Sequence, residues 1–154
     1  MKRVLCFVTV TIILLAFWQA AFAGNGPAGY DAITLNEIKS SQFATAPIRV
    51  SKDSEGTILL YKTNRGMYGK LLIRKYSCYK QPLTVLTINF TTYRSNGRVY
   101  KRGSNLVVSA QGCDLDTGRK TAGKNIDFKC VANLAMPANG ARFALYKNLS
   151  LIHI

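Results

Sequence analysis

The chain has little of the chemistry on which enzymes and metal sites usually depend. Its 154 residues include one histidine, His153, and no two cysteines separated by two residues. A zinc site is therefore not expected, because such sites usually combine several cysteine and histidine ligands. Catalysis by acid–base or nucleophilic routes needs a base positioned beside a nucleophile, and the sequence shows no such pairing. We therefore expect a protein that is not an enzyme and needs no metal or cofactor.

Tryptophan and acidic residues are also scarce. Trp18 is the only tryptophan, and it lies in a segment that we expect to be removed, which excludes a flat tryptophan platform for crystalline polysaccharide. Seven Asp and Glu stand against 21 Lys and Arg, and no acid occurs from Gly56 to Cys113. Ten basic residues lie in that stretch: Lys62, Arg65, Lys70, Arg74, Lys75, Lys80, Arg94, Arg98, Lys101 and Arg102. Such a stretch should give one surface a positive potential that attracts polyanions.

The N-terminus has the pattern of a secretory signal peptide. Lys2 and Arg3 precede an apolar run over residues 4–18, and Ala21-Phe22-Ala23 supplies a small-residue cleavage pattern. An uncleaved anchor is the alternative, although the run is shorter than the roughly 20 residues of a membrane span. We expect residues 1–23 to be removed. That leaves a single β-rich secreted domain over 24–154, extracellular or periplasmic, with no transmembrane segment and a formal charge of +12.

The cysteines leave the redox state open. Cys6 departs with the signal peptide, so the mature chain keeps Cys78, Cys113 and Cys130. An oxidising compartment permits one disulfide and one spare thiol, in any of three pairings. Three reduced thiols are the remaining alternative.

Short segments rich in β-branched and aromatic residues dominate the mature chain. Eight of them, separated by turn residues, are expected to be strands: 48–51, 57–62, 68–78, 83–94, 98–102, 105–110, 125–134 and 141–147. Thr34 and Glu37 have capping-box spacing and predict a short N-terminal helix over 35–42. The sequence therefore predicts an all-β, mostly antiparallel fold, a β-sandwich or partly open barrel of about seven or eight short strands.

Asn96-Gly97 is typical of a tight hairpin turn. A two-residue loop puts Tyr93 opposite Tyr100, whereas a three-residue loop puts Arg94 opposite Arg98. The two-residue register separates apolar from polar side chains along both strands, and a slip of one residue loses that separation. We therefore expect the two-residue register.

In that register, tyrosines alternate with Lys and Arg on one side of neighbouring strands. Tyrosine rings stack on sugars while their hydroxyls hydrogen-bond, and arginine holds sulfate, phosphate or carboxylate in a fork. The predicted binding face consists of Tyr68, Lys70, Arg74, Tyr76, Tyr93, Arg98, Tyr100 and Arg102. A solvated sheet face shows the same alternation and is the alternative.

The segment Asp114-Leu115-Asp116-Thr117-Gly118 resembles a calcium loop only weakly. An EF-hand would place its glycine one position later and a glutamate where Asn125 stands, and the basic residues that follow would oppose a cation. We therefore expect an acidic β-turn without metal. A hydrolase that uses Asp114 or Asp116 is a third functional hypothesis.

The sequence thus predicts a secreted, non-catalytic binding module for an extracellular anionic polysaccharide, glycan or anionic surface. The alternative is an exported effector, toxin-like protein or inhibitor that acts on a membrane surface or a protein partner. Export disfavours nucleic acid as a partner, and the sequence contains no motif of a nucleic-acid-binding fold.

Overall fold

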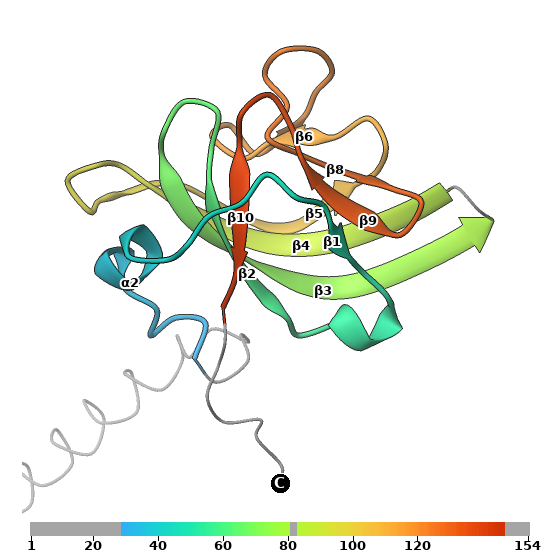
Figure 1. Ribbon diagram of the computed structural model, residues 1–154, viewed down its shortest axis with the longest axis horizontal. Coiled ribbons are helices and arrows are strands. Elements are labelled where there is room, and N and C mark those ends of the chain that lie inside the picture. The colour runs from blue at the N-terminus through green and yellow to red at the C-terminus, as the bar shows by residue number, and fades with distance from the viewer. Residues whose placement is uncertain (1–28, 81–82, 147–154) are drawn as a thin grey trace, which may run out of the picture.

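The computed structural model describes residues 29–80 and 83–146, so the predicted signal peptide and His153 lie outside the described residues (Figure 1). Within these residues no helix is long and apolar enough to cross a membrane. Two five-stranded antiparallel sheets form an all-β, sandwich-like fold, which confirms the predicted fold class. The long sheet has the order β10(Arg142–Leu145), β2(Ile58–Lys62), β3(Tyr68–Lys80), β4(Leu83–Tyr93), β5(Val99–Val108). The short sheet has the order β1(Ile48–Arg49), β9(Leu134–Pro137), β8(Phe128–Val131), β6(Cys113–Asp114), β7(Arg119–Lys120).

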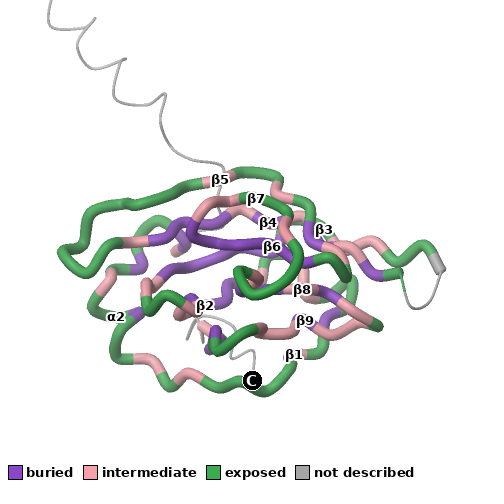
Figure 2. Tube along the Cα trace, turned by 90° about the horizontal axis from the view of Figure 1, so that it is seen from above, coloured by how far each residue is buried: buried purple, intermediate pink, exposed green. Residues whose placement is uncertain are grey.

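The two sheets enclose one apolar core. The long sheet contributes alternate side chains, and the short sheet contributes residues such as Phe128, whose ring meets Phe143 edge-on at 5.1 Å between centroids. The fully buried part of this core includes Leu59, Tyr61, Leu71, Ile73, Leu86, Ile88, Phe90, Leu115 and Phe128. Figure 2 shows the contrast between the buried trace of β4 and the exposed trace of β5 at the sheet edge.

A second apolar cluster lies on the other face of the long sheet. There Tyr30, Ile33 and Ile38 of the N-terminal segment pack against β2 and β3, including Leu60 and Leu72. Ile38 belongs to α2(Leu35–Lys39), which begins at the predicted capping box and ends three residues earlier than expected. A single turn of 3-10 helix, η1(Lys52–Ser54), follows β1.

Several strand boundaries differ from the sequence expectation. The predicted strands 98–102 and 105–110 form one strand, β5, with Gly103 inside it and opposite Phe90. A Cβ at position 103 would collide with the Phe90 ring, so glycine lets the strand pass this point. The predicted strand 125–134 is instead a hairpin, β8–β9, whose turn residues Ala132 and Asn133 both have positive φ. The two-residue strands β6 and β7 were not predicted at all.

The predicted hairpin register is wrong at the turn. The Arg94 N–H donates to the Arg98 carbonyl at 2.8 Å, and Tyr93 pairs with Val99, so the loop has three residues. Gly97 has a φ of +85°, the left-handed conformation that closes a three-residue loop with a bulge. A register shift at Thr92/Tyr93 restores the expected pairing from Thr92 to Phe90, and a second shift between Phe90 and Ile88 changes it again.

The cysteines form no disulfide in the part of the chain that the structure describes. Cys113 and Cys130 are buried in the core between the sheets, and Cys78 is exposed on β3. The disulfide candidates are therefore corrected to free thiols. Burial raises the pKa of Cys130 to about 11 and that of Cys113 further, so both behave as small apolar core residues.

Candidate functional site

The eight residues of the predicted binding face do not share one face. Tyr68 and Tyr100 lie at one end of the long sheet, whereas Arg74 and Arg102 line a separate pocket on its outer side. Arg98 is exposed beside the β4–β5 turn. The predicted face therefore splits into two sites and several residues with other contacts.

Tyr76 is on the opposite side of the sheet from the other predicted residues of β3. The β3–β4 pairing shifts by one residue between Ile73 and Lys75, a bulge that reverses the alternation of side chains. Tyr76 consequently packs against the core between the sheets, and its hydroxyl donates to Asn133 Oδ1 at 2.8 Å. The alternation predicted from sequence held only as far as this bulge.

Lys70 is buried rather than presented to a ligand. Its exposed fraction is 2%, and its ammonium donates to the carbonyls of Tyr30 at 2.5 Å and Ile33 at 3.0 Å. The ammonium also lies 4.9 Å from the centroid of the Tyr30 ring and 5.9 Å from that of Tyr93. Burial lowers the pKa of Lys70. Lys70 therefore holds the N-terminal segment on the sheet, which corrects its predicted role in binding.

A basic groove lies where the β2–β3 and β4–β5 turns meet α2. We call it the turn groove. Its lining residues are Lys39, Arg65, Gly66, Met67, Tyr68, Arg94, Ser95 and Tyr100, around a volume of about 590 Å³. Three cations line it and no carboxylate does, so the groove should attract anions.

Two contacts fix the walls of the turn groove. The Lys39 ammonium donates to the Ser95 carbonyl at 3.2 Å and joins the helix to the hairpin. The Arg94 guanidinium lies 5.0 Å from the centroid of the Tyr100 ring, a cation–π contact that presents ring and charge side by side. Tyr100 is 40% exposed, which leaves it accessible for stacking.

A second, smaller pocket lies on the outer side of β3, β4 and β5. It has a volume of about 330 Å³, and Arg74, Asn89 and Arg102 line it together with Ser104 and Asn105. Asp31 also lines this pocket and offsets part of its positive charge. For an anionic ligand the turn groove is therefore the better site.

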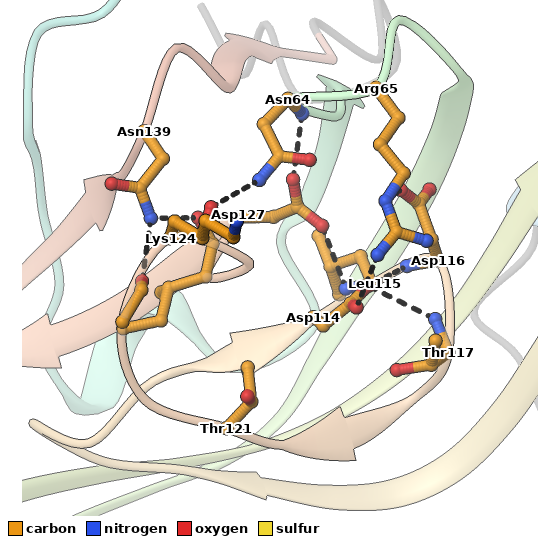
Figure 3. Close-up of polar contacts among 12 residues, drawn as sticks. Asn64, Arg65, Asp114, Leu115, Asp116, Thr117, Thr121, Lys124, Asp127 and Asn139 are labelled. Carbon is orange, nitrogen blue, oxygen red and sulfur yellow. Dashed lines mark hydrogen bonds and ion pairs between the residues drawn. The ribbon is translucent and has the colours of Figure 1, made fainter.

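Beside the turn groove, three aspartates come together inside the protein (Figure 3). Asp114, Asp116 and Asp127 are 4%, 1% and 0% exposed, and one oxygen from each lies within 4.8 Å of the others. Asp127 accepts from the backbone N–H groups of Asn64 at 2.7 Å and Leu115 at 2.9 Å. We call these three residues the aspartate cluster.

The other two carboxylates of the aspartate cluster have different surroundings. Asp114 Oδ1 accepts from the N–H groups of Asp116 and Thr117, as in a capped turn. The oxygens of Asp116 have no hydrogen-bond partner among the described residues. Burial raises the pKa of Asp127 to about 6, and it also raises the pKa of Asp116, while neighbouring Thr63 and Arg65 act in the opposite direction on Asp116.

Arg65 belongs to both sites. Its Nη2 lies 3.6 Å from Asp114 Oδ2 and its Nε lies 3.8 Å from Asp116 Oδ2, while its side chain is 46% exposed and lines the turn groove. These distances are those of a loose ion pair, longer than charge-assisted hydrogen bonds of about 2.7–2.9 Å. The guanidinium is therefore held weakly between carboxylates and solvent.

Sequence reasoning missed four of these residues. Three of them, Lys39, Arg65 and Arg94, were counted in the overall charge but not placed in the binding face. Arg65 lies only three residues before Tyr68, and Arg94 directly follows Tyr93, and both tyrosines were placed there. Asp127 was not associated with Asp114, because the β8–β6 pairing that joins them is not local. No family model, no curated protein and no solved structure matches this chain.

Proposed function

We propose that this protein is an exported, non-catalytic module that binds an anionic polysaccharide or glycan in the turn groove. The observation that carries the proposal is the convergence of Lys39, Arg65 and Arg94 with Tyr68 and Tyr100 on a groove that no carboxylate lines. Export is the expectation from residues 1–23 and supports an extracellular partner.

The chemistry of the groove suits a sulfated or carboxylated sugar chain. The exposed ring of Tyr100 offers a surface on which a sugar can stack, and Arg94 beside it can bind an acidic group on the same sugar. Lys39 and Arg65 are placed to contact further acidic groups as the polymer continues along the groove. A neutral polysaccharide would gain the stacking but not the ionic contacts, so we expect selectivity for the anionic polymer.

The test is retention of the purified protein on an immobilised sulfated polysaccharide over a salt series, beside a neutral polysaccharide column. The variant Lys39→Ala with Arg94→Ala should elute at lower salt and bind at least tenfold more weakly, since each lost ionic hydrogen bond is worth about 1.5–3 kcal/mol. Arg119→Ala with Lys120→Ala is the matched control, because it removes the same charge from exposed β7.

A second double variant separates the two pockets. Arg98→Ala with Arg102→Ala removes two charges outside the turn groove, one of them from the pocket that contains Asp31. We expect it to behave like the β7 control. Equal weakening by all three double variants would mean that the charge acts diffusely, and the proposed site would be abandoned.

A further inference from the structure

The aspartate cluster concentrates negative charge in the protein interior. Asp114 ends β6, Asp116 follows two residues later, and Asp127 directly precedes β8. All three are buried, and one oxygen from each lies within 4.8 Å of the others. Ionised carboxylates in such a place repel one another strongly unless a positive charge lies among them.

Asp116 supplies a second observation that points to a missing partner. Its side chain is 0% exposed, and neither of its oxygens has a hydrogen-bond partner in the described ranges 29–80 and 83–146. Buried polar atoms in folded proteins are nearly always hydrogen-bonded, so an unpartnered pair of carboxylate oxygens needs an explanation. A bound ligand that accepts lone pairs from these oxygens would explain why they have no hydrogen-bond partner.

Arg65 does not fully supply that partner. One guanidinium stands against three carboxylates, at 3.6 Å from Asp114 and 3.8 Å from Asp116, and nearly half of its side chain is exposed. It lies in the turn between β2 and β3, with Gly66 in the left-handed region beside it. The guanidinium can therefore leave the cluster for the turn groove without disturbing a strand.

We propose that Asp114, Asp116 and Asp127 bind a divalent cation of the calcium type, which takes the place of the Arg65 guanidinium. The donor atoms are carboxylate oxygens alone, the set preferred by hard cations. This inference does not rest on the proposed binding of a polymer.

Three carboxylates on one ion favour Ca²⁺ over Mg²⁺, because Mg²⁺ usually keeps several waters and is held by one or two carboxylates, whereas Ca²⁺ accepts more oxygen ligands in flexible geometry. The three oxygens lie within 4.8 Å of one another, close enough for one ion to contact all of them. Asp116 Oδ2 faces Arg65 at 3.8 Å and neither Asp116 oxygen has a hydrogen-bond partner in the described ranges, so both can coordinate an ion once the guanidinium leaves. Asp127 keeps a lone pair on each oxygen beside the backbone N–H that it accepts. Water molecules would complete the coordination shell.

The site differs from the calcium loop considered from sequence. The third carboxylate comes from Asp127, beyond the position that Asn125 occupies in the EF-hand comparison. The basic residues that were expected to oppose a cation, Arg119, Lys120 and Lys124, are exposed, so solvent screens them.

The test is thermal unfolding and calorimetric titration of the purified protein, first freed of metal with a chelator, with CaCl₂ and MgCl₂. We expect saturable Ca²⁺ binding at one site per chain. At 100 times the dissociation constant, the ratio of folded to unfolded protein should rise about 100-fold. Mg²⁺ should bind at least tenfold more weakly. Tighter binding of Mg²⁺ would overturn the assignment to calcium, and no saturable effect of either ion would overturn the site.

Variants identify the ligands. Asp116→Asn should abolish the Ca²⁺ effect while folding as well as the parent in chelator. Asp53→Asn removes an exposed carboxylate on η1 and should change neither the Ca²⁺ effect nor the stability in chelator. Arg65→Gln should tighten Ca²⁺ binding about tenfold, because it removes the competing charge. If Asp116→Asn retains the Ca²⁺ effect, the ion binds elsewhere and the inference fails. The titration of the parent protein decides the question even if a variant does not fold.

Discussion

Arg65 Nη2 lies 3.6 Å from Asp114 Oδ2, and the same side chain lines the turn groove. One guanidinium therefore stands between a buried set of carboxylates and a surface suited to anions. A cation in the aspartate cluster and an anion in the turn groove would each act on Arg65. We therefore expect the two sites to be thermodynamically coupled, and such coupling must be reciprocal.

The first prediction is that Ca²⁺ strengthens binding of a sulfated polysaccharide. A cation in the aspartate cluster should release Arg65 into the turn groove, where it adds one ionic contact, and affinity should rise about fivefold or more. The measurement is polymer affinity with and without Ca²⁺ at constant ionic strength. Asp116→Asn is the control, because its affinity should not respond to Ca²⁺. An equal response of the parent and this variant would show that Ca²⁺ acts on the polymer instead.

The second prediction concerns stability against pH in the presence of a chelator. Burial raises the pKa of Asp127 from its usual 3.8 to about 6 in the folded protein. The stability associated with its protonated form is therefore present below about pH 4 and is lost as the pH rises toward about 6, an effect on the order of 3 kcal/mol. Asp116 acts in the same direction. Glu37 and Glu55 have lowered pKa values, so they act in the opposite direction and only at lower pH.

Urea unfolding at several pH values between 4 and 7 measures this dependence. Asp127→Asn should flatten the curve, whatever its own effect on stability, because the slope reports the lost titration. A parent curve that rises from pH 4 to 7 would contradict the prediction.

The contrast between local and distant signals explains how much the sequence could predict. The capping box of Thr34 and Glu37 was predictable because both partners lie within one turn, and the structure contains both of its hydrogen bonds. The core strands were predictable from β-branched and aromatic residues. The two-residue strands β6 and β7 were not, because Asp-, Gly- and Lys-rich segments form them only when β8 and the turn residues are already in place.

The prediction of the binding face failed for a related reason. Alternation of Tyr with Lys and Arg assigns side chains to a face only while the register holds, and the bulge near Arg74 turns Tyr76 into the core. Lys70 lies on the expected face, but the N-terminal segment covers it, a contact between residues 40 positions apart. No pattern within a strand reveals such a cover.

The third prediction concerns the three thiols. Cys78 is exposed, whereas burial raises the pKa of Cys130 to about 11 and also raises the pKa of Cys113. Because the thiolate is the reactive form, brief alkylation at pH 8 should modify Cys78 in the folded protein and the other two only after unfolding. Peptide mapping by mass spectrometry makes the measurement. A Cys113–Cys130 disulfide in the unreduced map would contradict the two buried free thiols of the structure.

The last prediction separates a structural role for Lys70 from a binding role. Lys70→Met keeps the length of the side chain but removes the ammonium that donates to Tyr30 and Ile33, so buried carbonyls lose their donor. We expect a loss of about 1–3 kcal/mol in the free energy of unfolding. The N-terminal segment should also be cut more rapidly by protease.

Lys75→Met is the matched control, since Lys75 is exposed on the same strand. Both variants lose one positive charge, so both should lower retention on a sulfated polysaccharide by the same small amount, while only Lys70→Met should lower stability. If Lys70→Met instead weakened polymer binding strongly and left unfolding unchanged, its ammonium would have to reach the ligand. The N-terminal segment would then have to move off the sheet during binding, and Tyr30 and Ile33 would become exposed. Protease sensitivity of the segment with and without polymer distinguishes these two arrangements directly.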